Sequence, residues 1–183
     1  MCLFTYEPNA NDFAGIGLSR ADHTRVVDMH FTDKPLADSW IAPVVHGFED
    51  NPAANGDFPS LSDYNQIPVM TVKAWNALRP LIGYCCEALP ISCSTGDLLF
   101  IIHVMQTIDC LDRHKSEFTT NATTGRINRI HKYCFRHFLL AGRHILKLPI
   151  NCGGELFVDD KFRRLVEVNS LKGLTFTELD TVN

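Results

Sequence analysis

The sequence predicts an α+β fold, a single domain with a mixed or antiparallel sheet packed with a few helices. The chain has 183 residues and is 45% hydrophobic, which is long enough for one domain with a real core and short for two. Two segments repeat apolar residues at helical spacing, and several short segments alternate or cluster apolar residues like strands. Strands and helices do not alternate regularly as in βαβ units, which disfavours a doubly wound parallel sheet.

The first half of the chain predicts one strand, one loop and one helix. CLFTYE, residues 2–7, is typical of a strand, and residues 49–68 contain three Pro and Asn-based turn signals that predict an exposed loop. Residues 71–84 predict a helix that Thr71 caps and Gly83 closes. Pro80 predicts an end or a kink near Arg79. The apolar face of this helix comprises Val72, Trp75, Leu78 and Ile82.

The second half of the chain is richer in strands. The apolar run at residues 98–105 is a buried strand or a short buried helix, and periodicity does not separate the two. Three further strands are expected at residues 126–135, 143–149 and 155–160.

A second helix is expected to begin at Asp159 and Asp160, whose carboxylates suit a helix N-terminus. Phe162, Leu165 and Val166 lie on one side of it, and it stops before Gly173. Residues 174–179 then alternate as a strand.

Cysteine usage and hydropathy predict a cytoplasmic protein. The seven Cys are irregularly spaced and contain no CxxC pair, which argues against a disulfide framework and for a reducing compartment. The N-terminal residues do not resemble a secretory signal, and no apolar stretch is long enough to span a bilayer. We therefore expect no membrane contact.

Charge is unevenly distributed along the chain. Residues 1–112 carry five Lys or Arg against fourteen Asp or Glu, a net charge of −9, whereas residues 113–172 carry twelve against five, a net charge of +7. Such asymmetry either steers a charged partner or lets the two parts of one domain neutralise each other.

The segment TIDCLDRHKSEF, residues 107–118, concentrates the residue types of active sites. Its spacing matches no known divalent-metal signature, such as HExxH, an EF-hand loop or a CxxC pair. The alternative is a buried strand that ends in a polar turn, where Asp109 or Asp112 bonds nearby backbone N–H groups. The potential metal ligands are Asp109, Cys110, Asp112, His114 and Glu117.

Other candidate motifs are weaker. His131, Cys134 and His137 are spaced so that neither a helix nor a strand directs all three at one ion. The chain contains no nucleophile elbow, Walker or dinucleotide-binding pattern. Basic and aromatic residues occur together at 126–136, as in nucleic-acid-binding strands. The net negative charge of the chain disfavours that function.

The order of several elements along the chain is more informative than any one of them. These elements are Asp57-Phe58-Pro59, Leu78 to Leu81, Glu87 to Pro90, Asp109 to Asp112 with Ser116, and Phe162 to Phe176 with Gly173. Their order resembles the bacterial immunity protein family Imm11. The resemblance covers residues 57–179 and leaves residues 1–56 as a variable N-terminal part of a single domain spanning 1–183.

The resemblance implies a binding protein, not an enzyme, that needs no cofactor. It would neutralise a cognate toxin delivered between competing bacteria, for example a nuclease injected by a type VI secretion system. It would form a heterodimer in which the toxin's active site is occluded. In that interpretation Pro59, Pro90, Asp109, Asp112, Ser116 and Gly173 belong to the family scaffold.

An acidic surface with aromatic anchors is the expected toxin-binding face, because acidic inhibitors complement the basic clefts of nucleases. The candidates are Trp40, Phe48, Glu49, Asp50, Asp57, Phe58 and Asp63. Burial in the core is the alternative for Trp40 and Phe58.

Two other function classes stay open from the residues alone. One is a small metal-dependent hydrolase that uses Asp109, Asp112 and His114, with His131 or His137. The other is a nucleic-acid-binding protein that uses the basic face at residues 126–136.

Overall fold

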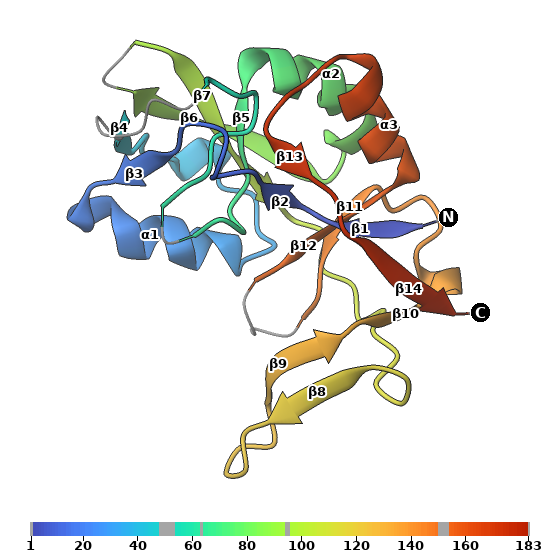
Figure 1. Cartoon of the computed structure of the whole chain (residues 1–183). Coiled ribbons are helices and arrows are strands. Elements are labelled where there is room, and N and C mark those ends of the chain that lie inside the picture. The colour runs from blue at the N-terminus through green and yellow to red at the C-terminus, as the bar shows by residue number, and fades with distance from the viewer. Residues whose placement is uncertain (1, 48–53, 63, 94–95, 150–153, 183) are drawn as a thin grey trace.

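The computed structural model describes residues 2–47, 54–62, 64–93, 96–149 and 154–182, and it confirms the predicted α+β fold. Two five-stranded sheets and three α-helices make up the body of the molecule (Figure 1). None of the helices in these ranges has the length and apolar character that a bilayer crossing requires.

The first sheet joins the two ends of the chain. Its strand order is β10-β14-β1-β12-β11, and β1 pairs antiparallel with both β12 and β14. Strand β10 pairs parallel with β14, and β11 pairs antiparallel with β12. The strands are β1 (Leu3–Thr5), β10 (Cys134–Arg136), β11 (Ile145–Lys147), β12 (Leu156–Asp159) and β14 (Glu178–Val182).

The second sheet is also mixed, with the order β3-β4-β6-β7-β5. Only β4 and β6 are parallel neighbours; the other pairs are antiparallel. The strands are β3 (Ile16–Leu18), β4 (Val44–Gly47), β5 (Val69–Thr71), β6 (Cys86–Cys93) and β7 (Leu98–Val104).

Strand β7 resolves the ambiguity of the apolar run at residues 98–105. Leu99 and Ile101 face a core that α1 (Arg20–His30) closes, whereas Ile102 and Val104 face a second core that α2 (Val72–Ile82) closes. Both faces of the strand are covered, so its residues are apolar without alternation, as in any strand buried on two sides.

Helix α2 confirms the predicted helix at residues 71–84. The Thr71 hydroxyl accepts a hydrogen bond from Ala74 N at 3.2 Å and caps the N-terminus, and Gly83 follows the last turn. The helix continues through Pro80 to Ile82, so of the two expected alternatives at Pro80, an end or a kink, the end near Arg79 does not occur. Pro80 lies on the exposed side, where water can bond the carbonyl that loses its helical partner. The buried residues are Ala74, Leu78 and Ile82; Val72 is exposed.

Helix α3 (Asp160–Val168) begins where the sequence predicts. The Asp159 carboxylate accepts hydrogen bonds from Lys161 N and Phe162 N, at 3.1 and 3.0 Å. At the other end Ser170 has a φ of 51°, and Leu171 N bonds Val166 O at 3.0 Å, which forms a Schellman motif. Helix α3 packs beside α2 over the core that both helices share with the two sheets (Figure 1).

Several predicted strands are divided or shortened. Residues 126–135 form β9 (Ile127–Lys132) and the start of β10, and residues 174–179 divide between β13 (Leu174–Thr175) and β14. Helix α1 and strands β3, β4 and β6 were absent from the prediction. Mixed polar and apolar positions in α1 bury only Val26, Met29 and His30, which leaves little periodic signal.

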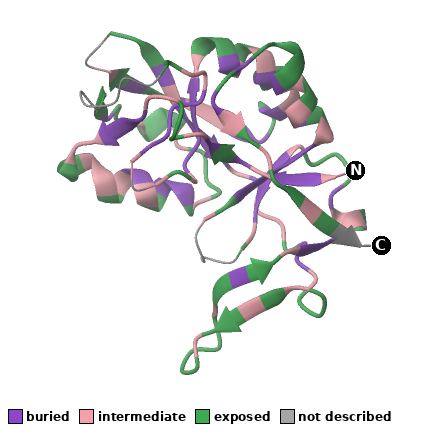
Figure 2. Cartoon of the chain, viewed as in Figure 1, coloured by how far each residue is buried: buried purple, intermediate pink, exposed green. Residues whose placement is uncertain are grey.

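Two small ribbons complete the fold. Strand β2 (Glu7–Pro8) pairs with β13. Strand β8 (Glu117–Thr120) pairs with β9 to form a hairpin that projects away from the body of the molecule (Figure 1). Most of its residues are exposed (Figure 2).

Candidate functional site

The TIDCLDRHKSEF segment is a tightly bonded connection between β7 and the hairpin. Cys110 and Leu111 are buried in the core beneath the first sheet. The Asp112 carboxylate accepts hydrogen bonds from His114 N and Lys115 N at 3.0 and 3.2 Å. The Ser116 hydroxyl bonds both the carbonyl and the N–H of Cys134. These contacts make Asp112 and Ser116 turn-forming residues, with Asp112 closing an Asx turn.

The second carboxylate of the segment behaves differently. Asp109 is half-exposed at its side chain and lies 3.7 Å from the guanidinium of Arg113 and 4.0 Å from that of Arg136. No group of three His, Cys, Asp or Glu side chains converges as a metal site in the described ranges. The geometry here therefore connects strands and offers no ligand set around an ion.

Asp57 and Phe58, two of the candidate interface residues, point inward. The Asp57 carboxylate accepts a hydrogen bond from Lys172 N at 2.9 Å and lies 3.3 Å from Lys73 Nζ, and its side chain is 13% exposed. Phe58 is 1% exposed in the core between α2, α3 and the sheets. Phe58 thus takes the core position that the sequence left as its alternative.

Three further residues of the motifs, Pro59, Gly173 and Pro90, have structural roles in the backbone. Pro59 follows Phe58 at a buried position, and Gly173, with a φ of +106°, lies opposite. A Cβ added to Gly173 would lie 3.5 Å from Phe58 N, and the φ of Gly173 lies in the region that favours glycine. Pro90, in the middle of β6, is exposed, and its carbonyl accepts a hydrogen bond from Trp40 Nε1 at 2.8 Å.

Trp40 is the candidate anchor that keeps a surface position. Its ring is half-buried, carries the Arg25 guanidinium 5.2 Å from its centroid, and borders a hollow of roughly 340 Å³. Ile41 and Val44 beside it are exposed, at 70% and 59%. Asp28 lines the same hollow and Asp38 is exposed nearby in sequence. The other four candidates, Phe48, Glu49, Asp50 and Asp63, lie outside the described residues.

A buried polar cluster, which the sequence did not indicate, joins the end of α1 to both sheets. Lys147 Nζ, from β11, donates to His30 O at 2.7 Å and Thr32 O at 3.1 Å, and lies 3.3 Å from the Asp33 carboxylate. His103, from β7, contacts Thr32 O through Nε2 at 2.9 Å and Glu87 through Nδ1 at 3.2 Å.

Burial controls protonation within this cluster. Desolvation lowers the pKa of His30 to about 4, although its Nε2–H donates to Gly154 O at 2.7 Å. Desolvation also lowers the pKa of Lys147, against the opposing effect of Asp33. Burial alone would raise the pKa of Glu87, but hydrogen bonds from Leu36 N and His103 bring it below its usual value. The cluster is a satisfied internal network.

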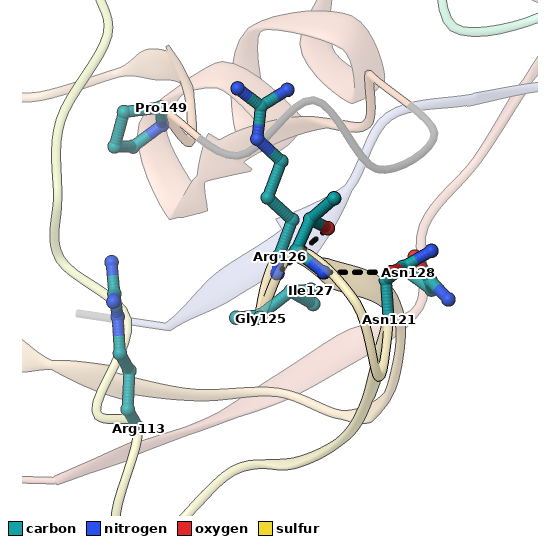
Figure 3. A pocket seen from close by; sticks show the side chains of 8 residues that line it. Arg113, Asn121, Gly125, Arg126, Ile127, Asn128 and Pro149 are labelled. Atoms are coloured by element: carbon teal, nitrogen blue, oxygen red, sulfur yellow. Dashed lines mark hydrogen bonds between the residues drawn. The ribbon is translucent and has the colours of Figure 1, made fainter.

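Positive charge gathers on the projecting hairpin. Residues 113–132 contain five Lys or Arg and one Glu. Beside its tip is a hollow of roughly 730 Å³ to which Arg113, Arg126 and Pro149 contribute. Both guanidinium groups extend toward the side of the hollow where Pro149 lies (Figure 3). The basic face that the sequence placed at residues 126–136 is thus partly on the hairpin and partly, from Cys134, in the first sheet.

Comparison with known proteins assigns the chain to a family. The search of curated proteins gave no match. A family model described as "Immunity protein family (Imm11)" matches residues 91–181. This range begins within β6, includes β7, the turn at Asp112, the hairpin and α3, and ends within β14. Through residues 91–181, the chain belongs to the Imm11 family of immunity proteins.

Proposed function

We propose that this protein protects its cell by binding a cognate antibacterial toxin in a one-to-one complex that covers the toxin's active site. Its family membership is the observation that carries the proposal, since immunity proteins act on toxins. The buried cluster supports binding over catalysis, because its polar groups are engaged within the protein. His30 and Lys147 line a hollow of roughly 220 Å³, but His30 bonds Gly154 O and Lys147 Nζ bonds two backbone carbonyls.

The proposed target is an effector that acts in the cytosol after delivery by a type VI secretion system, such as a nuclease. A nuclease presents a basic cleft for phosphate, and the acidic residues 1–112 of this chain would complement it. We also infer that residues 1–183 act as one immunity-type domain, because β1 and β12, far apart in sequence, pair within one sheet.

The proposed contact surface centres on Trp40. An aromatic ring flanked by exposed Ile41 and Val44 offers the apolar centre that interfaces require, and Asp28 and Asp38 would supply an acidic rim. Glu49 and Asp50 belong to the same acidic part of the chain.

Co-expression tests this function. The product of the neighbouring gene, as the candidate toxin, is induced in a sensitive bacterial host with and without the immunity protein, and growth is followed. We expect growth only with the protein present, and co-purification of the two at equal stoichiometry. Growth arrest despite expression of folded protein would refute the proposal.

A further inference from the structure

The β8–β9 hairpin is an arm that forms a two-stranded sheet of its own, separate from the two five-stranded sheets. Phe118 and Ile130 are paired across the two strands and attach the hairpin's base to the core under the first sheet. Beyond them, Thr119, Thr120, Asn128 and Arg129 are exposed. Within the described part of the chain, β8 and β9 pair only with each other, so each has a free outer edge.

The tip of the arm is held in one conformation. The Asn121 side chain accepts hydrogen bonds from Thr123 N and Thr124 N, both at 2.9 Å, and Asn121 N bonds Arg126 O at 2.8 Å. Gly125 adopts a φ of 68° to close the turn. A preorganised loop loses little conformational entropy when it binds, so this tip is suited to recognition.

Basic side chains at the base of the arm have acidic partners, whereas those toward the tip do not among the residues that the structure describes. Lys132 lies 3.6 Å from the Asp180 carboxylate, and Arg113 lies 3.7 Å from that of Asp109. Arg126 and Arg129 are exposed, and neither has an acidic partner within 4.0 Å among the residues that the structure describes. The tip therefore presents positive charge that the protein does not itself compensate.

We propose that this arm docks against an acidic surface of the toxin, with Arg126 and Arg129 contacting carboxylates and the hollow beside Arg113 receiving the partner's chain. The inference rests on the proposed function and names a second contact surface, distinct from that around Trp40. Charge complementarity sets the partner's chemistry, because Arg is the preferred residue for bidentate contacts with carboxylates. The unpaired strand edges add backbone donors and acceptors for an extended segment.

A protein partner fits the arm better than a nucleic acid. Binding of single strands without sequence preference relies on aromatic side chains that stack on bases. The aromatic residue of the hairpin strands, Phe118, packs against the core instead of facing outward. The arm thus combines charge and backbone edges but lacks an exposed stacking surface in its described residues.

Association kinetics with the purified toxin from the adjacent gene test the inference. The double variant Arg126→Glu/Arg129→Glu is compared with wild type and with a matched control, Lys161→Glu/Arg164→Glu, which reverses two exposed cations on α3. We expect the arm variant to associate about tenfold more slowly at low salt, and the control to stay within about twofold of wild type. The melting temperature of all three proteins verifies folding.

The outcomes separate the two proposals. If wild type forms no complex with the toxin, the proposed function fails, and this inference fails with it. If wild type binds and protects but the arm variant matches the control, only the arm inference is overturned. Poly-uridine RNA serves as the second probe: binding by wild type that the arm variant loses, together with unchanged toxin binding, would assign the arm to nucleic acid and overturn the inference.

Discussion

Lys147 Nζ lies 2.7 Å from the backbone carbonyl of His30, and this bond connects the first sheet to the C-terminal end of α1. The last carbonyls of a helix lack intrahelical partners and carry partial negative charge, so an ammonium group is a suitable partner there. The Lys147 side chain is 7% exposed. A buried cation thereby joins residues 1–56 to the part of the chain that matches the family.

Replacing this cation tests its contribution. Lys147→Met keeps the length and apolar stem of the side chain but leaves the buried His30 carbonyl without its donor. We expect the free energy of unfolding to fall by about 2 kcal/mol, the typical cost of a buried unpaired polar group. Urea denaturation measures it, with Lys161→Met, at an exposed position, as a control that changes stability little. Equal stabilities of the two variants would argue against this role of Lys147.

Acid should weaken the fold through His30. The folded state holds the pKa of His30 at about 4, below its ordinary value of 6.5, so the unfolded chain binds the proton more readily. Above pH 6.5 His30 makes its full contribution to the free energy of unfolding. As the pH drops from 6.5 to 4, this contribution is lost, and the free energy of unfolding falls by on the order of 3 kcal/mol. Desolvation is the main cause, and Lys147 and His103 add repulsion.

Denaturation at a series of pH values checks the effect, and His30→Gln is the matched variant because it retains an N–H donor toward Gly154 O. The variant should be less stable than wild type near neutral pH and should show a shallower loss between pH 6.5 and 4. An identical slope in both proteins would assign the acid sensitivity to other groups.

One substitution should stabilise the protein. Ser170 adopts a left-handed conformation at the end of α3, with a φ of 51°, where glycine carries no steric penalty. Ser170→Gly should raise the free energy of unfolding by about 0.5–1 kcal/mol, whereas Ser170→Ala, which retains a Cβ, should give no gain. Calorimetry on the three proteins distinguishes these outcomes, and a lower melting temperature for the glycine variant would contradict the strain argument.

The turn carboxylate should matter for stability and not for protection. Asp112→Ala removes two hydrogen bonds to the turn and should cost about 1 kcal/mol, while Asp109→Ala, at an exposed ion pair, should cost less. Both variants should still protect co-expressing cells from the toxin. Loss of protection by folded Asp112→Ala, with a stoichiometric metal in the wild-type protein, would instead support a hydrolase.

Charge reversal at the acidic part of the chain tests the predicted toxin-binding face. Glu49→Lys together with Asp50→Lys should slow association with the toxin, about tenfold at low salt, because electrostatic steering would be reversed. Thermal stability should change little. Stopped-flow or surface-binding kinetics measure the rate, and an unaltered rate would mean that the toxin docks elsewhere.

Local rules predicted those elements whose signals are local. Helix α2 with its cap at Thr71 lies where the sequence indicates, and so does the Asp159 cap of α3. Both caps depend on contacts between residues a few positions apart. Helix α1 depends on a face of few apolar residues, and its place is fixed by long-range contacts such as Lys147 with His30. The sequence around His30 does not indicate that its carbonyl bonds a side chain 117 positions away.

The exposure of the candidate surface residues is the property that the sequence indicates least, for a physical reason. Composition identifies acidic and aromatic residues but not which side chains the fold engages: Asp57 bonds Lys172 N, and Phe58 fills the core. Among the described candidates, Trp40 borders a surface hollow. The sequence predicts one basic strand face at residues 126–136, but β9 pairs with β8 in a separate hairpin while residues from Cys134 join the first sheet.

The position of β1 in the first sheet constrains when that sheet can form. Its neighbours on either side are β12 and β14, so β1 finds its sheet partners only after residues 156–182 have been synthesised. The nascent chain must hold an apolar segment unpaired throughout that interval, which favours slow, late folding. The first sheet is therefore complete only after β14 has been synthesised, more than 170 residues behind β1.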